Sequence, residues 1–265
     1  TDSGVGAPIT CGSGYTPDVW YKAKVPASGN LAVETFNVGV NDFVSVLTLY
    51  SGTPGSLFQI ACNDGRGTSN LSKVIVSGQT PGDTLYIRVW RGSYAGEYPF
   101  EICARDPVIP ANDLPTTATA LAVGSGSCGT PTQGTTIDAT DSGVGAPASC
   151  GDGYATDVWY KATVPASGNL AVETFNVGVN DFDTVLNIYL GTPGSLSQIA
   201  CNDNGDTSSL SKVVVSGQTP GATLYARVWG IYDVDYPFNI CAWEPQSLST
   251  KQVVLESFRV YPNPT

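Results

Sequence analysis

The chain has 265 residues, of which 42% are hydrophobic and 13% charged, and its net charge is −11 at pH 7. This composition is typical of a globular protein rather than a disordered one. The negative charge argues against nucleic-acid binding, which requires a basic face for the phosphates. Histidine, the commonest general base and transition-metal ligand, is absent.

Two long segments of the chain have nearly the same sequence, 139 positions apart. Val25–Phe43 is repeated without change at Val164–Phe182. A repeat of this length is a whole domain rather than a solenoid unit. The predicted organisation is a first domain over 1–106, a linker over 107–117, a second domain over 118–245, and a tail over 246–265.

Each repeat predicts seven or eight short strands. In the second repeat, seven strands are expected at 157–164, 169–175, 182–189, 196–201, 210–217, 223–229 and 236–243. In the first of these, Val158 and Tyr160 alternate with Trp159 and Lys161, as in a strand with two different faces. Turn sequences such as PASGN and GTPGS separate the strands. The predicted fold class is all-β, with two tandem antiparallel β-sandwiches of the jelly-roll type.

The second repeat is preceded by a leader, residues 112–140, that has no counterpart before the first repeat, because residue 1 matches Thr140. The first repeat therefore lacks one or two opening strands and the match to Cys128. We expect the natural protein to extend upstream. Otherwise the first domain has an open sheet edge that another chain could fill.

Seven cysteines in a β-rich chain predict an oxidising, extracellular setting. Zinc is not expected, because the chain has neither a CxxC pair nor a histidine. Four cysteines allow three pairings, so the sequence alone leaves the pattern open. The repeat suggests that Cys11 has no partner and that the disulfides are Cys62–Cys103, Cys128–Cys150 and Cys201–Cys241.

Acidic and amide residues near strand ends predict a calcium site, since Ca²⁺ takes six to eight oxygen ligands. The predicted ligands in the second repeat are Asp157, Glu173, Asp181, Asp183, Asn202, Asp203 and Asp206. A weaker set in the first repeat is Asp18, Glu34, Asp42 and Asp64.

The first repeat is less suited to a cation. It has Val44 where the second has Asp183, and Arg66 where the second has Gly205. Net charge is −2 over 1–106 and −8 over 141–245. In the alternative interpretation these residues cap strands and fill turns, or Asp183 bonds the backbone at a β-bulge.

Aromatic side chains near strand ends predict a possible ligand face that could stack on sugar rings or grip a peptide. Its residues are Trp90, Tyr94, Tyr225, Arg227, Trp229 and Tyr232. The commoner interpretation of such a pattern is a cross-strand aromatic ladder that covers the sandwich.

We predict that the chain is not an enzyme. Without histidine it cannot form a Ser-His-Asp triad, and no GxSxG motif stands in a strand–turn–helix context. A pair of carboxylates for glycoside hydrolysis is the only catalytic arrangement that the sequence leaves open.

The segments DVWYK, PASGNLAVETF, NDFDTVLNIY, ACND and TLYARVW occur in this order in the second repeat, and close variants occur in the first. This series resembles the bacterial pre-peptidase C-terminal domain. The resemblance implies a CUB-like β-sandwich that serves as a non-catalytic appendage of secreted proteases, other hydrolases and adhesins. It also implies calcium, protein or polysaccharide binding in some relatives.

The final segment FRVYPNPT, residues 258–265, resembles the opening of the C-terminal sorting domain of the type IX secretion system. The resemblance implies export across the outer membrane of a Gram-negative bacterium, with the secretion machinery as a partner of the tail. A proline-rich linker is the alternative. No stretch of the sequence is apolar and long enough to span a membrane.

Together these features predict a secreted or cell-surface pair of adhesion or binding modules, with Ca²⁺ as a possible cofactor. The expected partners are an extracellular polysaccharide, a protein, or neighbouring copies of the chain. Two alternatives are a structural repeat of an extracellular stalk or filament, and an accessory region of a secreted protease or glycosidase.

Overall fold

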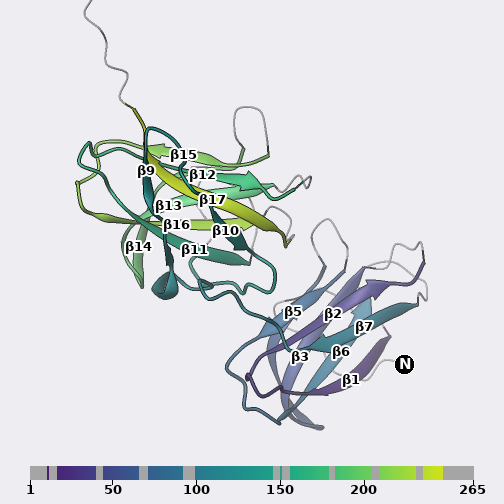
Figure 1. Ribbon diagram of the computed structural model, residues 1–265. Helices are drawn as coiled ribbons and strands as arrows, with labels where there is room; N and C mark the ends of the chain where they lie inside the picture. The colour runs from purple at the N-terminus through teal and green to yellow at the C-terminus, as the bar shows by residue number, and fades with distance from the viewer. Residues whose placement is uncertain are drawn as a thin grey trace, which may run out of the picture.

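The computed structural model describes residues 11, 17–39, 44–65, 71–91, 99–145, 150, 156–178, 183–204, 209–230 and 235–246. Within them the chain forms two β-sandwiches, coloured purple to blue and teal to yellow in Figure 1. Nearly all strand pairs are antiparallel. The predicted fold class is confirmed. In this part of the chain no helix is long and apolar enough to cross a membrane.

The first sandwich consists of a four-stranded and a three-stranded sheet. Its strands are β1 Asp18–Lys24, β2 Leu31–Asn37, β3 Ser45–Thr53, β4 Ser56–Asn63, β5 Lys73–Val76, β6 Thr84–Arg91 and β7 Phe100–Arg105. The strand orders are β1-β6-β3-β4 and β5-β2-β7. Among the described residues, β1 and β7 are therefore edge strands.

The second sandwich repeats these seven strands and adds three more. The repeated strands are β11 Asp157–Thr163, β12 Leu170–Asn176, β13 Thr184–Thr192, β14 Ser195–Asn202, β15 Lys212–Val215, β16 Thr223–Gly230 and β17 Pro237–Glu244. The strand orders are β14-β13-β16-β11-β8 and β10-β17-β12-β15, with β9 beside β17.

The additional strands all come from the leader. After the 3₁₀ turn η1 (Pro115–Thr117) they are β8 Thr119–Ala120, β9 Val123–Ser125 and β10 Thr132–Thr135. β8 pairs in parallel with β11, whereas β9 and β10 both pair with β17. The leader therefore covers one edge of each sheet. It contains three short strands where the sequence predicted one or two.

A hydrophobic core fills each sandwich. Val158 and Tyr160 lie in the core of the second domain, in agreement with the predicted alternation. Trp159, on the opposite face of β11, is buried as well, because Ala118 and Tyr189 pack against it. Burying one such large apolar side chain contributes about 1.5–3 kcal/mol, so the leader stabilises both faces of β11.

The predicted disulfide pattern is wrong. The observed disulfides are Cys11–Cys62, Cys150–Cys201 and Cys128–Cys241, and Cys103 is an exposed free thiol. The first two have the same separation of 51 residues in each repeat, so corresponding cysteines form corresponding bonds.

The topology explains the correction. Cys201 lies on β14 and Cys241 on β17, in different sheets of the sandwich. The leader strand β9 pairs with β17, and this brings Cys128 beside Cys241 at a Cα–Cα distance of 5.8 Å. Cys128 therefore fastens the leader to the second sandwich.

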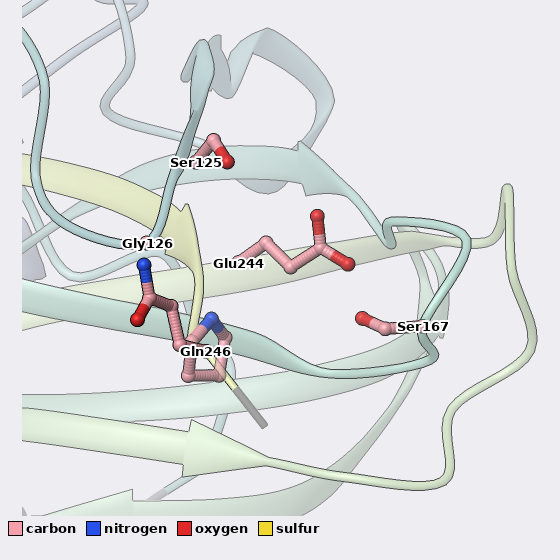
Figure 2. Close-up of a pocket in the computed structure, with 6 residues that line it drawn as sticks. Ser125, Gly126, Ser167, Glu244 and Gln246 are labelled. Carbon is pink, nitrogen blue, oxygen red and sulfur yellow. The ribbon is translucent and has the colours of Figure 1, made fainter. Parts of the chain in front are cut away.

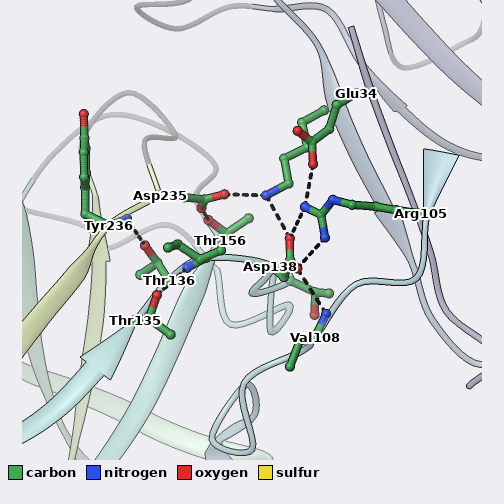
Figure 3. Close-up of polar contacts among 12 residues, drawn as sticks. Glu34, Arg105, Val108, Thr135, Thr136, Asp138, Thr156, Asp235 and Tyr236 are labelled. Atoms are coloured by element: carbon green, nitrogen blue, oxygen red, sulfur yellow. Dashed lines mark hydrogen bonds and ion pairs between the residues drawn. The ribbon is translucent and has the colours of Figure 1, made fainter. Parts of the chain in front are cut away.

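A group of charged side chains joins the two domains, and we call it the ionic clamp. It consists of Glu34, Lys73 and Arg105 of the first domain and Asp138 and Asp235 of the second (Figure 3). Arg105 binds Asp138 with two nitrogens, at 2.5 and 2.6 Å. Lys73 pairs with Asp235 and lies 3.4 Å from an Asp138 oxygen.

Asp138 is the centre of the ionic clamp. Its backbone has a φ of 61°, a left-handed conformation that is uncommon for a residue with a side chain. Its carboxylate also accepts a hydrogen bond of 3.1 Å from the backbone N–H of Val108. The hydrogen bond from Arg105 lowers the pKa of Asp138 to about 2, so the carboxylate is ionised at neutral pH.

Candidate functional site

The second repeat has Asp183–Thr184 where the first has Val44–Ser45. The two side chains of this pair have different structural roles. The Thr184 hydroxyl lies 2.7 Å from the Thr174 hydroxyl, and both accept hydrogen bonds from the backbone N–H of Ser211. The first domain forms the same buried network with Thr35, Ser45 and Ser72. The hydroxyl is therefore common to both domains, and only the Asp183 carboxylate is specific to the second.

Asp183 precedes β13 and Asp203 follows its partner strand β14, close enough for their charges to interact, and we call these two residues the acidic pair. One carboxylate oxygen of each is buried without a hydrogen-bond partner in the described structure. Burial raises the pKa of both carboxyls, and the charge of Asp203 raises that of Asp183 further. Two carboxylates in this situation would be stabilised by a bound cation, which would supply the missing partner.

Among the described residues, the other predicted calcium ligands of the second domain bond to protein groups. The Asn202 side-chain oxygen accepts a hydrogen bond of 3.3 Å from the backbone N–H of Lys212. Asp181 and Asp206 lie outside the described residues, as does Asp42 of the first domain. Among the residues that are described, no three acidic, cysteine or histidine side chains form a group that could hold a metal ion.

Asp157 forms a buried ion pair with the guanidinium of Arg227. It also accepts hydrogen bonds from the Ser142 hydroxyl at 2.8 Å and from the Trp159 indole at 3.1 Å. Burial raises the pKa of Asp157 to about 6, against the opposing effect of Arg227. Both carboxylate oxygens of Asp157 bind protein donors. Asp157 therefore stabilises the interior of the second domain and is not placed as a calcium ligand.

The first domain contains the equivalent ion pair. Arg88 Nε lies 2.8 Å from an Asp18 oxygen, and both side chains are almost fully buried. Asp18 and Arg88 are 70 residues apart, as are Asp157 and Arg227. Both ion pairs join residues that the repeat keeps, but every repeated pair of residues has the same spacing in both copies, so spacing alone could not indicate which residues pair.

The two predicted glutamate ligands lie on the outer faces of the sheets. Glu34 accepts a hydrogen bond of 2.6 Å from Arg105 within the ionic clamp. Glu173 lies 3.6 Å from the Lys212 ammonium, which is 5.0 Å from the Trp243 ring. Asp64, the remaining predicted ligand of the first domain, follows directly after β4.

The predicted aromatic ligand face is wrong for Trp90, Arg227 and Trp229, because all three side chains are buried. The Trp229 indole donates a hydrogen bond of 2.7 Å to the side chain of Asn187. The Arg88 guanidinium lies 4.8 Å from the Trp90 ring. These contacts indicate that the aromatic residues pack within the sandwich and do not form an exposed ligand face.

The other aromatic residues add no recognition face to the described structure. Tyr225 is half-buried beside Trp159 and Tyr189, whose ring centroids are 5.4 Å apart. Tyr94 and Tyr232 lie outside the described residues.

A polar cleft on the second domain, with a volume of about 300 Å³, was not indicated by any sequence pattern. It is lined by Ser125, Gly126, Ser167, Glu244, Pro245 and Gln246. Figure 2 shows the Glu244 side chain extending toward Ser167, with Ser125 from the leader on the opposite wall. One carboxylate, one amide and two hydroxyls thus surround a space of small-ligand size.

The matching position in the first domain is occupied by a direct hydrogen bond. Ser28, the counterpart of Ser167, donates to the carboxylate of Asp106, the counterpart of Glu244, at 2.5 Å. The first domain also has no described counterpart of Ser125 or Gly126, because these residues belong to the leader. The cleft therefore depends on the leader, and a comparison of the two repeats within the sequence could not reveal it.

A family model described as galactose binding domain-like, of the group associated with the type IX secretion system, matches residues 7–102 and again 111–218. The match supports the predicted link to this secretion system and the tandem organisation. The predicted resemblance to pre-peptidase C-terminal and CUB domains has no such support and stays a prediction. No curated protein matches the chain.

Several solved structures align with most of the chain but superpose poorly. An uncharacterised protein from Burkholderia cenocepacia is 14% identical, with a TM-score of 0.26, over 84% of this chain and 76% of its own. Carbohydrate-binding modules of the β-sandwich superfamily are 9% identical, with a TM-score of 0.22, over 84% and 94%. The CUB1-EGF-CUB2 region of human MASP-1/3 is also 9% identical, with a TM-score of 0.19, over 85% of this chain and 93% of its own.

The family match and the disulfides agree on the broad class of the protein. Domains of this class are non-catalytic binding modules, and the three disulfides of the described residues are typical of secreted or cell-surface proteins.

Proposed function

Since the chain belongs to the galactose binding domain-like family associated with the type IX secretion system, we propose that it is an exported adhesion module that binds carbohydrate. The observation that carries this proposal is the polar cleft of the second domain. Its carboxylate, amide and hydroxyl groups are suited to hydrogen-bonding the adjacent hydroxyls of a sugar. The volume of about 300 Å³ suits a single sugar unit at the end of a longer glycan.

Binding of the whole chain to a glycan array, followed by calorimetric titration with the best glycan and with free galactose, tests the proposal. We expect Glu244→Gln to weaken binding at least tenfold, because a charge-assisted hydrogen bond is worth about 1.5–3 kcal/mol. Ser167→Ala should weaken it less. The matched control is Asp106→Asn, which changes the corresponding position of the first domain and should leave glycan binding unchanged.

Two results would count against carbohydrate binding in the cleft. Absence of any glycan that binds the chain would contradict the function itself. Unchanged affinity in Glu244→Gln and Ser167→Ala would place the glycan elsewhere on the surface. Binding of an extracellular protein, blocked by the same two substitutions, would keep the cleft and change the ligand class.

The second part of the proposal is that Ca²⁺ binds the acidic pair and stabilises the second domain. It is supported by the buried carboxylate oxygens of Asp183 and Asp203 that have no partner, and by Val44 at the matching position of the first domain. A ligand at 100 times its Kd stabilises the native state by about 2.7 kcal/mol. We therefore expect calcium to raise the melting temperature of the second domain only.

Calorimetry of the whole chain in EDTA and in millimolar CaCl₂ tests this part. Asp183→Val, which copies the first domain, should abolish the calcium-dependent shift. Asp83→Val, an acidic turn residue of the first domain, is the control and should retain it. If calcium shifts neither transition, the acidic residues are ordinary turn residues.

We further propose that the tail directs export through the type IX system across the outer membrane of a Gram-negative bacterium. The proposal is supported by the FRVYPNPT segment and by the family match of both domains. Cell fractionation in a bacterium with and without this secretion system tests it. Export that does not require the system would contradict the proposal.

A further inference from the structure

The first domain exposes side chains at the outer edges of β1 and β7, and we call the surface that contains Val19, Tyr21, Phe100 and Cys103 the leader groove. In the second domain the matching strands β11 and β17 are both covered by the leader, through β8 on one side and β9 and β10 on the other. In the described part of the first domain, β1 pairs with β6 and β7 with β2, and no strand pairs with their outer edges. An open sheet edge is a site for addition of another strand.

The side chains of the leader groove are the same as in the second domain, yet they are exposed. Tyr21 is 40% exposed, whereas its counterpart Tyr160 is 1% exposed. Val19 is 44% exposed, whereas Val158 is fully buried. Because each pair is identical in residue type and strand position, the difference comes from the leader that covers the second domain. The first domain thus presents apolar surface suited to a covering segment.

The floor of the groove already has the geometry that receives the leader. Tyr21 and Phe100 meet edge to face with ring centroids 6.4 Å apart, and Tyr160 and Phe238 do so at 6.1 Å. In the second domain Gly134 of β10 lies directly on this pair of rings. A Cβ atom on Gly134 would overlap the Tyr160 hydroxyl and come within 2.8 Å of the Phe238 ring. A segment that fits must therefore have glycine at this point.

A second, independent feature points to the same segment. The leader of the second domain is tied to β17 by the disulfide Cys128–Cys241. In the first domain Cys103 stands at the matching register position, opposite Glu34 as Cys241 is opposite Glu173, and its thiol is free and exposed. The groove thus has the attachment point for a leader cysteine.

We infer that the leader groove of the first domain receives a β-segment of the Thr119–Thr135 type, whose cysteine forms a disulfide with Cys103. We assign this segment to the first domain itself, because the second domain carries its leader in the same chain, directly ahead of its core strands. A leader joined in this way has a high effective concentration at the groove.

A synthetic peptide of residues 118–137 tests the inference on the whole chain, with Cys128 of the peptide supplied as its mixed disulfide with glutathione. The Cys103 thiolate attacks the peptide sulfur, a new disulfide forms, and glutathione leaves as its thiolate. No other oxidant is needed. The measurements are the rate of conjugation by intact mass, and hydrogen exchange of the β7 amides.

We expect conjugation at Cys103 at least ten times faster than with a scrambled peptide of the same composition, because groove binding places the two sulfurs together. The β7 amides should become protected from exchange, whereas the β17 amides should not change. A peptide with Gly134→Val should react at the scrambled rate, because the added side chain would meet Tyr21 and Phe100. A chain with Cys103→Ser should form no conjugate but should still show protection of β7.

Equal rates for the native and scrambled peptides, with no protection of β7, would overturn the inference. The origin of the segment is tested by a chain that carries a duplicate of residues 118–139 directly ahead of Thr1. If Cys103 is protected from a thiol reagent while this protein is monomeric, the result would support the assignment of the β-segment to the same chain as the groove. If the original chain instead forms dimers in which β7 is protected, the segment comes from a second copy, and this assignment is wrong.

Discussion

The two domains share most of their sequence but differ in what surrounds the shared residues. Val19 and Tyr21 of the first domain are exposed, whereas Val158 and Tyr160 are core residues. The leader accounts for this difference, and it also supplies one wall of the polar cleft. A strand can thus be predicted correctly in both copies of a repeat while its environment depends on a segment that lies outside the repeat.

The buried ion pairs are the feature that the two domains share most closely, and breaking them should have the largest effect. Asp157→Ala should destabilise the second domain by about 3–5 kcal/mol, because it leaves the Arg227 charge buried without its counter-ion. Asp18→Ala should do the same to the first domain through Arg88. Calorimetry of each variant should show one lowered transition and one unchanged transition. Equal lowering of both would mean that the domains do not unfold independently.

Removing the leader disulfide should make the second domain more like the first. Cys128→Ser combined with Cys241→Ser should cost the second domain about 2–5 kcal/mol and expose part of β17 to hydrogen exchange. Cys103→Ser in the first domain should change stability by less than about 0.5 kcal/mol, because this thiol is exposed and unbonded. A large effect of Cys103→Ser would contradict the assigned disulfide pattern.

Among the described residues, the ionic clamp is a contact through which one domain can influence the other. Asp138→Asn should remove about 1.5–3 kcal/mol of charge-assisted hydrogen bonding to Arg105 and loosen the arrangement of the domains. Small-angle X-ray scattering should then show a larger radius of gyration, whereas each domain should melt as before. Ser77→Ala, a substitution of an exposed residue outside the clamp, is the control.

The pH dependence of the clamp follows from the lowered pKa of Asp138. The ordinary pKa of this carboxyl is 3.8 and the folded value is about 2. The contribution of Asp138 is therefore fully present above pH 4 and is lost as the pH falls toward 2. Scattering curves should be constant from pH 7 to about pH 4 and should expand only below it. Expansion that begins near pH 6 would point to a different group.

The smallest effect is expected from giving the first domain the extra aspartate alone. Val44→Asp restores one carboxylate of the acidic pair beside Asp64, but the loop still contains Arg66 in place of Gly205. We expect calcium to raise the first melting transition by less than about 1 °C, because the positive charge of Arg66, two residues after Asp64 in the sequence, opposes a divalent ion. Adding Arg66→Gly and Gly67→Asp should increase the shift. No increase would show that the loop sequence does not control calcium binding.

The tandem β-sandwich organisation could be predicted from the sequence, because strand alternation and turn residues are local properties and the repeat presents them twice. The sequence also shows that the second domain is the more acidic one. Which residues share a site depends on the tertiary structure. Asp157 and Asp18 are predicted ligands by residue type, but the fold places each against a buried arginine, whose charge they neutralise.

The disulfides and the polar cleft depended on the tertiary structure for the same reason. Cys128 meets Cys241, and Ser125 meets Glu244, only because β9 pairs with β17 across more than a hundred residues. Such contacts depend on which distant strands pair. The spacing of residues along the chain does not show which strands these are. Local chemistry therefore determines the elements, and the packing of a short leader on two sheet edges forms the polar cleft.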